Sequence, residues 1–311
     1  MKFKFFSKPL IILTTFIALH QSALAQEQTA AFSPTFPMEM EFASDKVSFD
    51  RFDMYERMDR EIISMTYSHT NTMLTIKRAN KYMEEIIPIL KEEKIPTDFI
   101  YLAAIESMFN ERAISPARAA GIWQFMPTTA KQYGLEVNKY VDERFNLEKA
   151  TRAACKYFRT AYRKYNDWLS VAASYNAGMT RISRSLEEQL EKKATDIFMN
   201  QETSRYIFRI LAMKLILNDP EHFGFKLKES QLYQHIDYKE VEVKEPVLSW
   251  PKWAKKQGIS YMHLREMNPW IRDTELPNKL KKTYIVRIPY ADQINVTTQT
   301  KHTYKYNWIQ K

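Results

Sequence analysis

The chain has 311 residues, with 46 Lys and Arg against 37 Asp and Glu, and its formal net charge is +9. Because Cys155 is its one cysteine, an internal disulfide is excluded. Cys155 lies in an alanine-rich helical stretch, a setting typical of a buried core residue. The chain has only five glycines, a composition that favours helix. The histidines lack metal-ligand spacing, and there is no glycine-rich phosphate loop or basic stripe with interleaved aromatics, so we expect no cofactor, metal or nucleic-acid partner.

The first 25 residues have the pattern of an export signal. Three lysines precede an apolar run over residues 10–19, and residues 23–25 supply the small side chains that a signal peptidase recognises. We expect cleavage after Ala25, which leaves a charge of about +6. No cysteine follows the run, and no later segment has the roughly 20 apolar residues of a membrane helix. The sequence therefore predicts a soluble protein of the periplasm or cell envelope, without a membrane anchor.

The next two regions differ in their apolar periodicity. Residues 26–53 have a weak pattern that Pro34 and Pro37 interrupt, and we interpret them as an extended arm. Residues 54–225, with a core at 96–217, show three- and four-residue apolar spacing and predict a helical domain. We expect a helical region over 54–90, with Pro88 and Pro96 as breaks, and a helix over 98–110 capped by Thr97. A short helix should run from Thr128 or Thr129 to Gly134, and a longer one, capped by Asn146, should end near Tyr165. Two more helices are expected, one from Asp167 to Gly178 and one over 203–217.

The pattern changes after a polar linker. Alternation over residues 239–243 and 283–288 predicts two strands, and residues 250–258 and 261–268 predict two short helices between them. Residues 239–290 therefore form a β-α-α-β module, and the fold class is mainly α with this small addition. Residues 291–311 are a polar tail to which the pattern assigns no element.

One carboxylate stands out on the helix predicted over residues 98–110. Glu106 shares a face with Phe99, Leu102, Ala103 and Phe109. Burial disfavours the charged form, so its pKa should rise, and it could hold a proton near neutrality. Most helical glutamates are solvated, so this position alone is weak evidence for catalysis. The other candidates, Glu111, Asp142, Glu143 and Glu202, do not lie on an apolar stripe.

Four short motifs follow in order. They are Glu106-Ser107, the Gly-x-x-Gln segment 121–124, the segment Ser174-Tyr175-Asn176, and the Glu-Thr-x-x-Tyr segment 202–206. With them the chain resembles the lytic transglycosylase family, most nearly its membrane-bound lytic murein transglycosylase D group. The resemblance implies a goose-lysozyme-like helical catalytic domain. Departures from the family pattern at Arg118, Trp123 and Ser174 remove no functional side chain.

The resemblance also implies the chemistry. Glu106 would act as the single general acid/base that cleaves the β-1,4 bond between N-acetylmuramic acid and N-acetylglucosamine in peptidoglycan, and the C6 hydroxyl of the sugar would close a 1,6-anhydro ring. The substrate-binding residues would be Ser115, Gln124, Tyr175, Asn176 and Tyr206. Glu202 would be a buried partner of an arginine. Without the motif order, Gln124 would be interpreted as a turn residue and Tyr175 as a half-buried aromatic.

Residues 239–290 resemble a LysM domain, a glycan-binding module. The resemblance rests on the segments 259–260, 264–269 and 284–289, whereas Glu245-Pro246-Val247 stands where the typical Gly-Asp-Thr turn is expected. The module is either a glycan-binding domain or a structural appendage. For the whole chain, two alternatives remain: a hydrolase of the goose-lysozyme kind, and a non-catalytic wall-binding scaffold, against which the intact Glu106 argues.

Overall fold

The computed structural model describes residues 33–309 of the chain, so the predicted signal peptide lies outside the described residues. Within the described range, no helix has the length and apolar character needed to cross a membrane. The elements are β1 (Glu39–Phe42), β2 (Asp45–Ser48), α2 (Phe52–Tyr67), α3 (His69–Glu92), α4 (Phe99–Ser107), α5 (Pro127–Gln132), α6 (Leu147–Tyr165), α7 (Trp168–Ala177), α8 (Met179–Glu188), α9 (Gln201–Asn218), β3 (Tyr238–Val243), α10 (Trp250–Lys256), α11 (Tyr261–Met267) and β4 (Tyr284–Pro289).

The segment predicted as an extended arm contains a β-hairpin. Strands β1 and β2 pair antiparallel, and the turn between them places Ala43 and Ser44 at φ of 54° and 72°. Phe42 and Phe49 are fully buried in the helical core, and the amide of Ala43 donates to Asp98 Oδ2 at 2.7 Å. The hairpin is therefore packed against the domain, which its short and irregular apolar pattern did not indicate.

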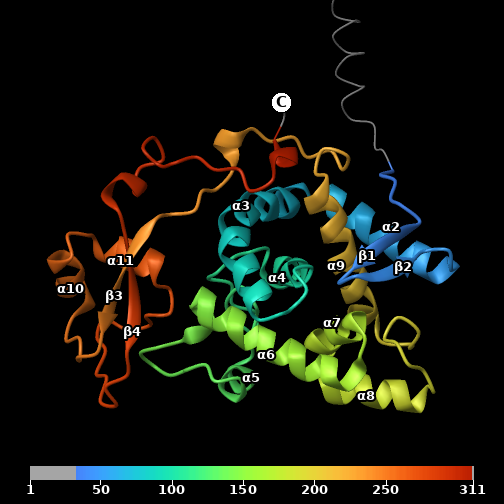
Figure 1. The fold of residues 1–311 in the computed structure, drawn as a ribbon, viewed down its shortest axis with the longest axis horizontal. Helices are drawn as coiled ribbons and strands as arrows, with labels where there is room; N and C mark the ends of the chain where they lie inside the picture. Colours follow the sequence, from blue (N-terminus) through green and yellow to red (C-terminus); the bar gives the residue numbers. More distant parts are fainter. Residues whose placement is uncertain (1–32, 310–311) are drawn as a thin grey trace, which may run out of the picture. The chain divides into compact units, whose positions relative to one another are not determined.

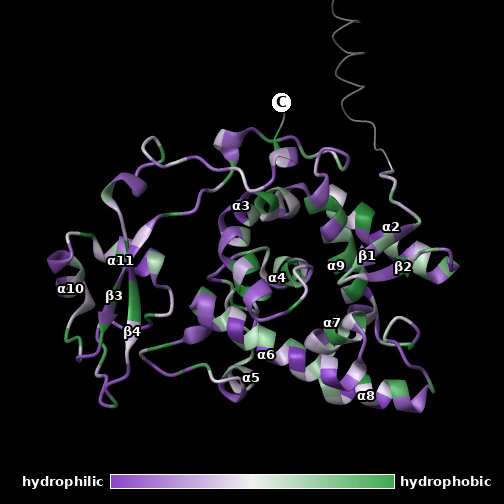
Figure 2. Cartoon of the chain, in the orientation of Figure 1, coloured by the Kyte–Doolittle hydropathy of each residue, from purple (hydrophilic) through white to green (hydrophobic). Residues whose placement is uncertain are grey.

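Helix α4 lies at the centre of the helical domain, with α3, α6, α7 and α9 around it (Figure 1). Every residue from Phe99 to Ala104 is buried, so α4 is apolar around its whole circumference. Its neighbours carry their hydrophobic residues along the faces that pack on the core (Figure 2). A buried central helix is a rigid support for any functional side chain near its end.

The predicted caps have mixed outcomes. Asn146 accepts a hydrogen bond from the amide of Lys149 at 3.0 Å, and Asp167 accepts one from Ser170 at 2.7 Å, which confirms the predicted starts of α6 and α7. The caps predicted at Thr97 and at Thr128 or Thr129 are wrong: Asp98 and Met126 precede α4 and α5, and neither accepts a capping bond.

Proline explains the start of α5 and a second correction. Pro127 opens α5, since its fixed φ suits a first helical position. Pro88, predicted as a break, lies inside α3, which continues to Glu92. The loss of one backbone hydrogen bond is tolerated here because α3 buries a long face that includes Ile86 and Leu90.

The predicted β-α-α-β order after the linker is confirmed, and with it the mainly α fold class. Strands β3 and β4 pair antiparallel with Val241 opposite Val286, and α10 and α11 cover them around the buried Trp250 and Leu264. The same apolar cluster includes Ala120, Val141 and Phe145 of the helical domain. The module therefore shares part of its core with that domain.

The tail, to which the sequence assigned no element, packs on the helical domain. Trp308 is 1% exposed, and its indole nitrogen donates to the carbonyl of Leu217 at the end of α9 at 2.6 Å. Asn80 of α3 donates to the carbonyl of His302 at 2.8 Å and accepts from the amide of Tyr304 at 2.8 Å. Residues after β4 thus tie the end of the chain to α3 and α9.

Cys155 is fully buried in α6, as predicted. Burial raises the pKa of its thiol to about 12, so the reactive thiolate is disfavoured.

Candidate active site

Glu106 lies one residue before the end of α4 and is partly exposed, whereas the preceding turns of the helix are buried. The helix ends abruptly, because Met108 and Phe109 both have left-handed backbone angles, with φ of 54° and 53°. Two consecutive residues other than glycine in this region are uncommon, and such strain is often found beside functional sites. The turn directs the chain away from Glu106 directly after the helix.

Tyr206 of α9 donates a hydrogen bond from its hydroxyl to Glu106 Oε1. Burial raises the pKa of Glu106 to about 7, while the Tyr206 hydrogen bond acts in the opposite direction and the nearby Glu202 charge raises it further. The same surroundings raise the pKa of the Tyr206 hydroxyl well above its usual value, so it remains a donor. Glu106 can therefore exist in either protonation state near neutral pH, which a group that gives and reclaims a proton requires.

Tyr175 and Asn176 lie in the last turn of α7, and Tyr175 is near Glu106. The Tyr175 hydroxyl donates to the carbonyl of Trp123 at 2.7 Å, and its pKa is raised by burial and by the nearby Glu106 carboxyl. Tyr175 thus connects α7 to the Gly-x-x-Gln segment. Asn176 is half-buried, and among the residues described its side chain has no hydrogen-bond partner. Its amide is free for a ligand.

The Gly-x-x-Gln segment is held in a tight loop. Gln124 has a φ of 48°, and its side-chain nitrogen donates to the carbonyls of Gly121 at 2.8 Å and Ala113 at 3.2 Å. Gly121 has a φ of 78°, and a Cβ there would lie 1.9 Å from the carbonyl oxygen of Arg144. Only glycine fits this position. Gln124 therefore holds the loop with its nitrogen, and its side-chain oxygen makes no hydrogen bond to the described part of the chain.

Ser115 lies at the start of the same loop. Its hydroxyl oxygen accepts from the amide of Ala119 at 3.0 Å, and its own amide donates to the carbonyl of Ala119 at 2.9 Å. The residue is partly exposed, and its hydroxyl hydrogen is not used in these bonds. Of the six predicted site residues, only Glu106 and Tyr206 share a direct hydrogen bond within residues 33–309.

Arg144 is a positioning residue that the sequence reasoning missed. It is 8% exposed, pairs with Asp142 at 2.7 Å, and donates to the carbonyls of Arg118 at 2.7 Å and Phe125 at 3.0 Å. These bonds hold together the two segments of the loop on either side of Gln124. The Asp-Glu-Arg run at residues 142–144 was a possible signal, but charged runs are usually solvated.

A second missed residue is Glu61 of α2, which is 1% exposed. It accepts from Arg205 at 2.7 and 3.1 Å and also lies 3.5 Å from Arg209, so it holds α9 on the side of Tyr206. The predicted role of Glu202 as a buried partner of an arginine is wrong, because Glu202 is exposed and Glu61 has that role. Both glutamates look alike in sequence, and only packing distinguishes them.

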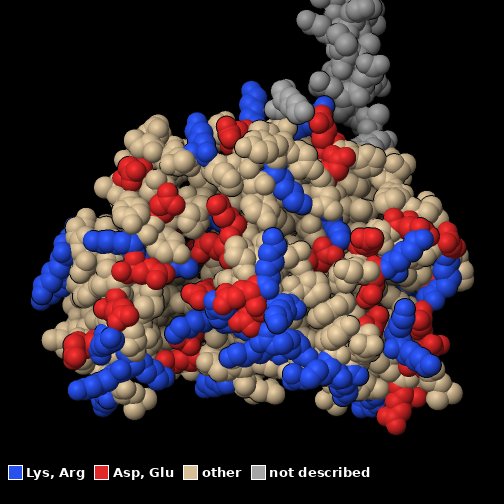
Figure 3. Space-filling model, in the orientation of Figure 1, with Lys and Arg blue, Asp and Glu red and all other residues tan. Residues whose placement is uncertain are grey.

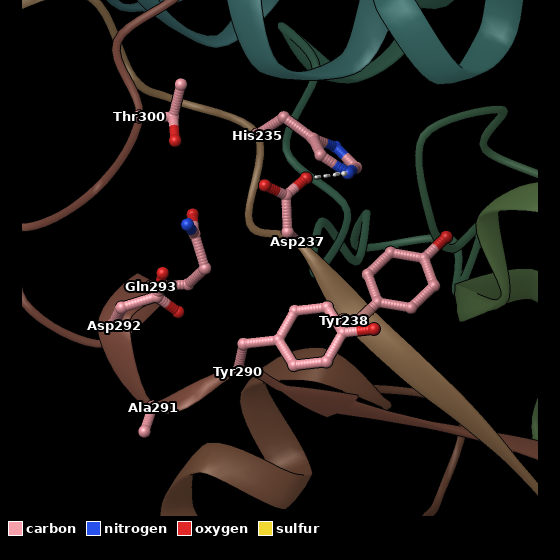
Figure 4. Close-up of a pocket in the computed structure, with 8 residues that line it drawn as sticks. All are labelled: His235, Asp237, Tyr238, Tyr290, Ala291, Asp292, Gln293 and Thr300. Carbon is pink, nitrogen blue, oxygen red and sulfur yellow. Dashed lines mark ion pairs between the residues drawn. The ribbon is translucent and has the colours of Figure 1, made fainter.

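The hollow shown in Figure 4 is a separate feature. It encloses about 720 Å³ beside the start of β3 and the end of β4, and it contains none of the predicted site residues. His235 faces Asp237 at 3.9 Å, and the Glu85 carboxylate, 3.4 Å from His235 Nδ1, raises the pKa of its imidazole. Across residues 33–309, no group of three or more His, Cys, Asp or Glu side chains is arranged to hold a metal ion.

Comparison with known families identifies the segment that carries Glu106. Residues 84–198 match the family described as Transglycosylase SLT domain. These residues belong to that family. The matched range includes Glu106, Ser115, Gln124, Tyr175 and Asn176, while Tyr206 lies beyond it. Residues 239–292 match the soluble lytic transglycosylase C-terminal LysM-like domain, so the chain has an SLT domain followed by a LysM-like domain.

Two individual relatives match different shares of the chain. The chain is 29% identical over 244 residues to the membrane-bound lytic murein transglycosylase D of Escherichia coli (strain K12), across 77% of this chain and 52% of that protein. It is 27% identical over 135 residues to a putative tributyltin chloride resistance protein of Alteromonas sp. (strain M-1), across 43% of this chain and 65% of that one. The chain thus spans about half the length of the transglycosylase that it matches.

Among solved structures, the 70 kDa soluble lytic transglycosylase of Escherichia coli is similar over 53% of this chain and 29% of that chain. The sequence identity is 20% and the TM-score 0.40.

Proposed function

We propose that the chain is a peptidoglycan lytic transglycosylase that cleaves the β-1,4 bond between N-acetylmuramic acid and N-acetylglucosamine and forms 1,6-anhydro-N-acetylmuramic acid. The observation that carries the proposal is the partly exposed Glu106 at the end of a buried helix, with a pKa of about 7 and a hydrogen bond from Tyr206. The SLT domain match over residues 84–198 supports the same reaction class.

The proposed reaction uses one carboxyl group twice. Protonated Glu106 donates its proton to the glycosidic oxygen, and the leaving sugar departs with the bonding electron pair. The C6 hydroxyl of the muramoyl sugar then attacks C1 and gives its proton to the Glu106 carboxylate, which restores the acid. No water is consumed, so one group with a pKa near neutrality is sufficient.

The neighbouring residues have supporting roles in this proposal. Tyr206 would stabilise the Glu106 carboxylate after the first proton transfer, because its hydroxyl is already directed at Oε1. The free amide of Asn176 and the free side-chain oxygen of Gln124 would bind polar groups of the sugar, together with the Ser115 hydroxyl. Tyr175 would fix the Gly-x-x-Gln segment through Trp123.

The substrate proposal is consistent with the charge of the protein. Figure 3 shows Lys and Arg side chains in a band over the lower part of the drawn face, where Figure 1 places α5 and α6. Peptidoglycan carries carboxylates, and a cationic surface would attract it. The LysM-like module would hold glycan strands, and residues 1–25 would direct the chain out of the cytoplasm.

One observation favours a second candidate function, hydrolysis of the same bond. Glu202 is exposed, and its charge raises the pKa of Glu106, so a second carboxylate lies near the proposed acid. A hydrolase would use that carboxylate to activate water, as glycosidases with two carboxylates do.

Mass spectrometry of the fragments released from purified peptidoglycan sacculi tests the proposal. A lytic transglycosylase should release anhydro products about 18 Da lighter than those of hydrolysis, since no water enters the bond. Products that end in reducing muramic acid would instead support the hydrolase. No release at all by the wild-type chain would support a wall-binding scaffold.

A further inference from the structure

A second hollow lies beside the turn that follows the catalytic helix. It has a volume of about 650 Å³ and is walled by residues 77–82 of α3, by residues 109–112 after α4, by the linker around residues 230–236, by Glu266 of α11 and by the tail around residues 296–301. None of the predicted site residues contributes to its lining. Five separate segments of the chain thus form a hollow outside the proposed catalytic residues.

The charged side chains that line this hollow are mostly cationic. Five basic side chains and two carboxylates contribute to it: Lys77, Arg78, Lys81, Arg112 and Lys301, with Glu111 and Glu266. A concave surface lined mainly by one sign of charge concentrates its field and attracts ligands of the opposite sign.

Three of these cations form no ion pair with the described part of the chain. Lys77, Lys81 and Lys301 have no carboxylate within 4.0 Å in the described part of the chain. By contrast, Arg112 pairs with Glu266 at 3.2 Å. The lysine charges therefore remain available to an anion that enters the hollow.

An aromatic ring and a carboxyl group in the lining limit the class of ligand that the hollow can bind. Tyr233 is 42% exposed, and Lys77 Nζ lies 5.5 Å from the centre of its ring, so a planar or apolar group could rest beside a positive charge. Glu111 is partly buried in the lining. Burial raises its pKa, and the charges of Lys81 and Arg112 act in the opposite direction.

We propose that this hollow binds a short acidic peptide that also carries a free amino group. The three lysines would pair with carboxylates spaced along the peptide, and Glu111 and Glu266 would accept the amino group. Those same two carboxylates oppose a compact phosphate, and a neutral sugar would leave the lysines unpaired. The stem peptides of peptidoglycan have this chemistry. Naming them as the source of the ligand rests on the proposed function, whereas the binding of such a peptide does not.

Calorimetric titration of the full chain with a purified stem peptide free of sugar tests this site. We expect binding that weakens with added salt. The double variant Lys77→Glu, Lys301→Glu should bind at least about tenfold more weakly, because two attractions become repulsions. The matched control is Lys255→Glu on α10, an exposed lysine outside the hollow, which should bind like the wild type. If the double variant unfolds, Lys301→Glu alone, on the exposed tail, should still weaken binding.

Absence of peptide binding by the wild type would overturn the proposal. It would also be overturned by equal binding of the double variant, or by equally effective competition from inorganic phosphate or from peptide-free glycan. Release of anhydro products from purified sacculi is measured separately. Its absence would count against the proposed function and leave the peptide site standing, so the two failures are distinguishable.

Discussion

At the residue scale, the proposed chemistry depends on Glu106, and Glu106→Gln separates its catalytic role from its structural one. Glutamine keeps the shape but cannot deliver or reclaim a proton. We expect product release from sacculi to fall by about 10³–10⁴-fold, because one group performs both proton transfers. Exposed Glu56→Gln on α2 is the control and should leave the rate unchanged. Near-normal release by Glu106→Gln would remove this residue from the mechanism.

The same variant should alter how stability depends on pH. The folded-state pKa of Glu106, about 7, lies above its ordinary value of 4.5, so its contribution to stability is full below pH 4.5 and lost as the pH rises through 7. Relative to the wild type, Glu106→Gln should therefore become more stable over this range, by at most about 3 kcal/mol. Thermal unfolding below pH 4.5 and above pH 7 measures the difference. A difference that does not change with pH would contradict the raised pKa.

Tyr206→Phe tests the partner of Glu106. The hydroxyl of Tyr206 lowers the pKa of Glu106, so its removal should move the alkaline limb of the pH–rate profile to higher pH. The maximal rate should fall by roughly tenfold, since the carboxylate loses a charged hydrogen bond. The control is Tyr165→Phe, which removes a hydroxyl that donates to the carbonyl of Met179 at 2.7 Å. In this control the alkaline limb of the pH–rate profile should not move. An unshifted limb in Tyr206→Phe would show that the bond does not tune the acid.

At the scale of elements, α9 is held in place by a buried charge. Glu61→Ala leaves Arg205 and Arg209 without their shared carboxylate, so we expect a loss of about 2–3 kcal/mol of stability. Because α9 also carries Tyr206, kcat should fall while KM changes little, and the alkaline limb of the pH–rate profile should shift. Exposed Glu56 on the same helix supplies the control, Glu56→Ala. A stability loss with unchanged kcat would make Glu61 purely structural.

At the scale of the whole molecule, the end of the chain closes onto the helical core. Trp308→Ala removes a fully buried ring and its bond to Leu217, and we expect a loss of about 3 kcal/mol, measured by the urea midpoint. The control is Tyr306→Ala, because Tyr306 is 75% exposed and lies two residues away. An unchanged midpoint for Trp308→Ala would mean that the tail contributes no stability to the domain.

Local patterns were sufficient for much of the fold. Side chains of α6 repeat at helical spacing, and strands β3 and β4 alternate, so periodicity alone predicted these elements. Caps at Asn146 and Asp167 were also predictable, since each bond joins residues three apart. The hairpin before α2 was not, because its buried Phe42 and Phe49 are stabilised by contacts with helices distant in sequence.

The sequence by itself determined the β-α-α-β order of the C-terminal module, the motif order and the carboxylate on the apolar face of α4, because these depend on spacing along short stretches of the chain. Only the tertiary structure decided that Tyr206 donates to Glu106 across 100 residues of sequence, and that Glu61 rather than Glu202 is the buried acid of α9. It also placed the tail on Leu217. The physical reason is that burial and hydrogen-bond partners are set by packing between segments, and packing is not encoded in the period of any one of them.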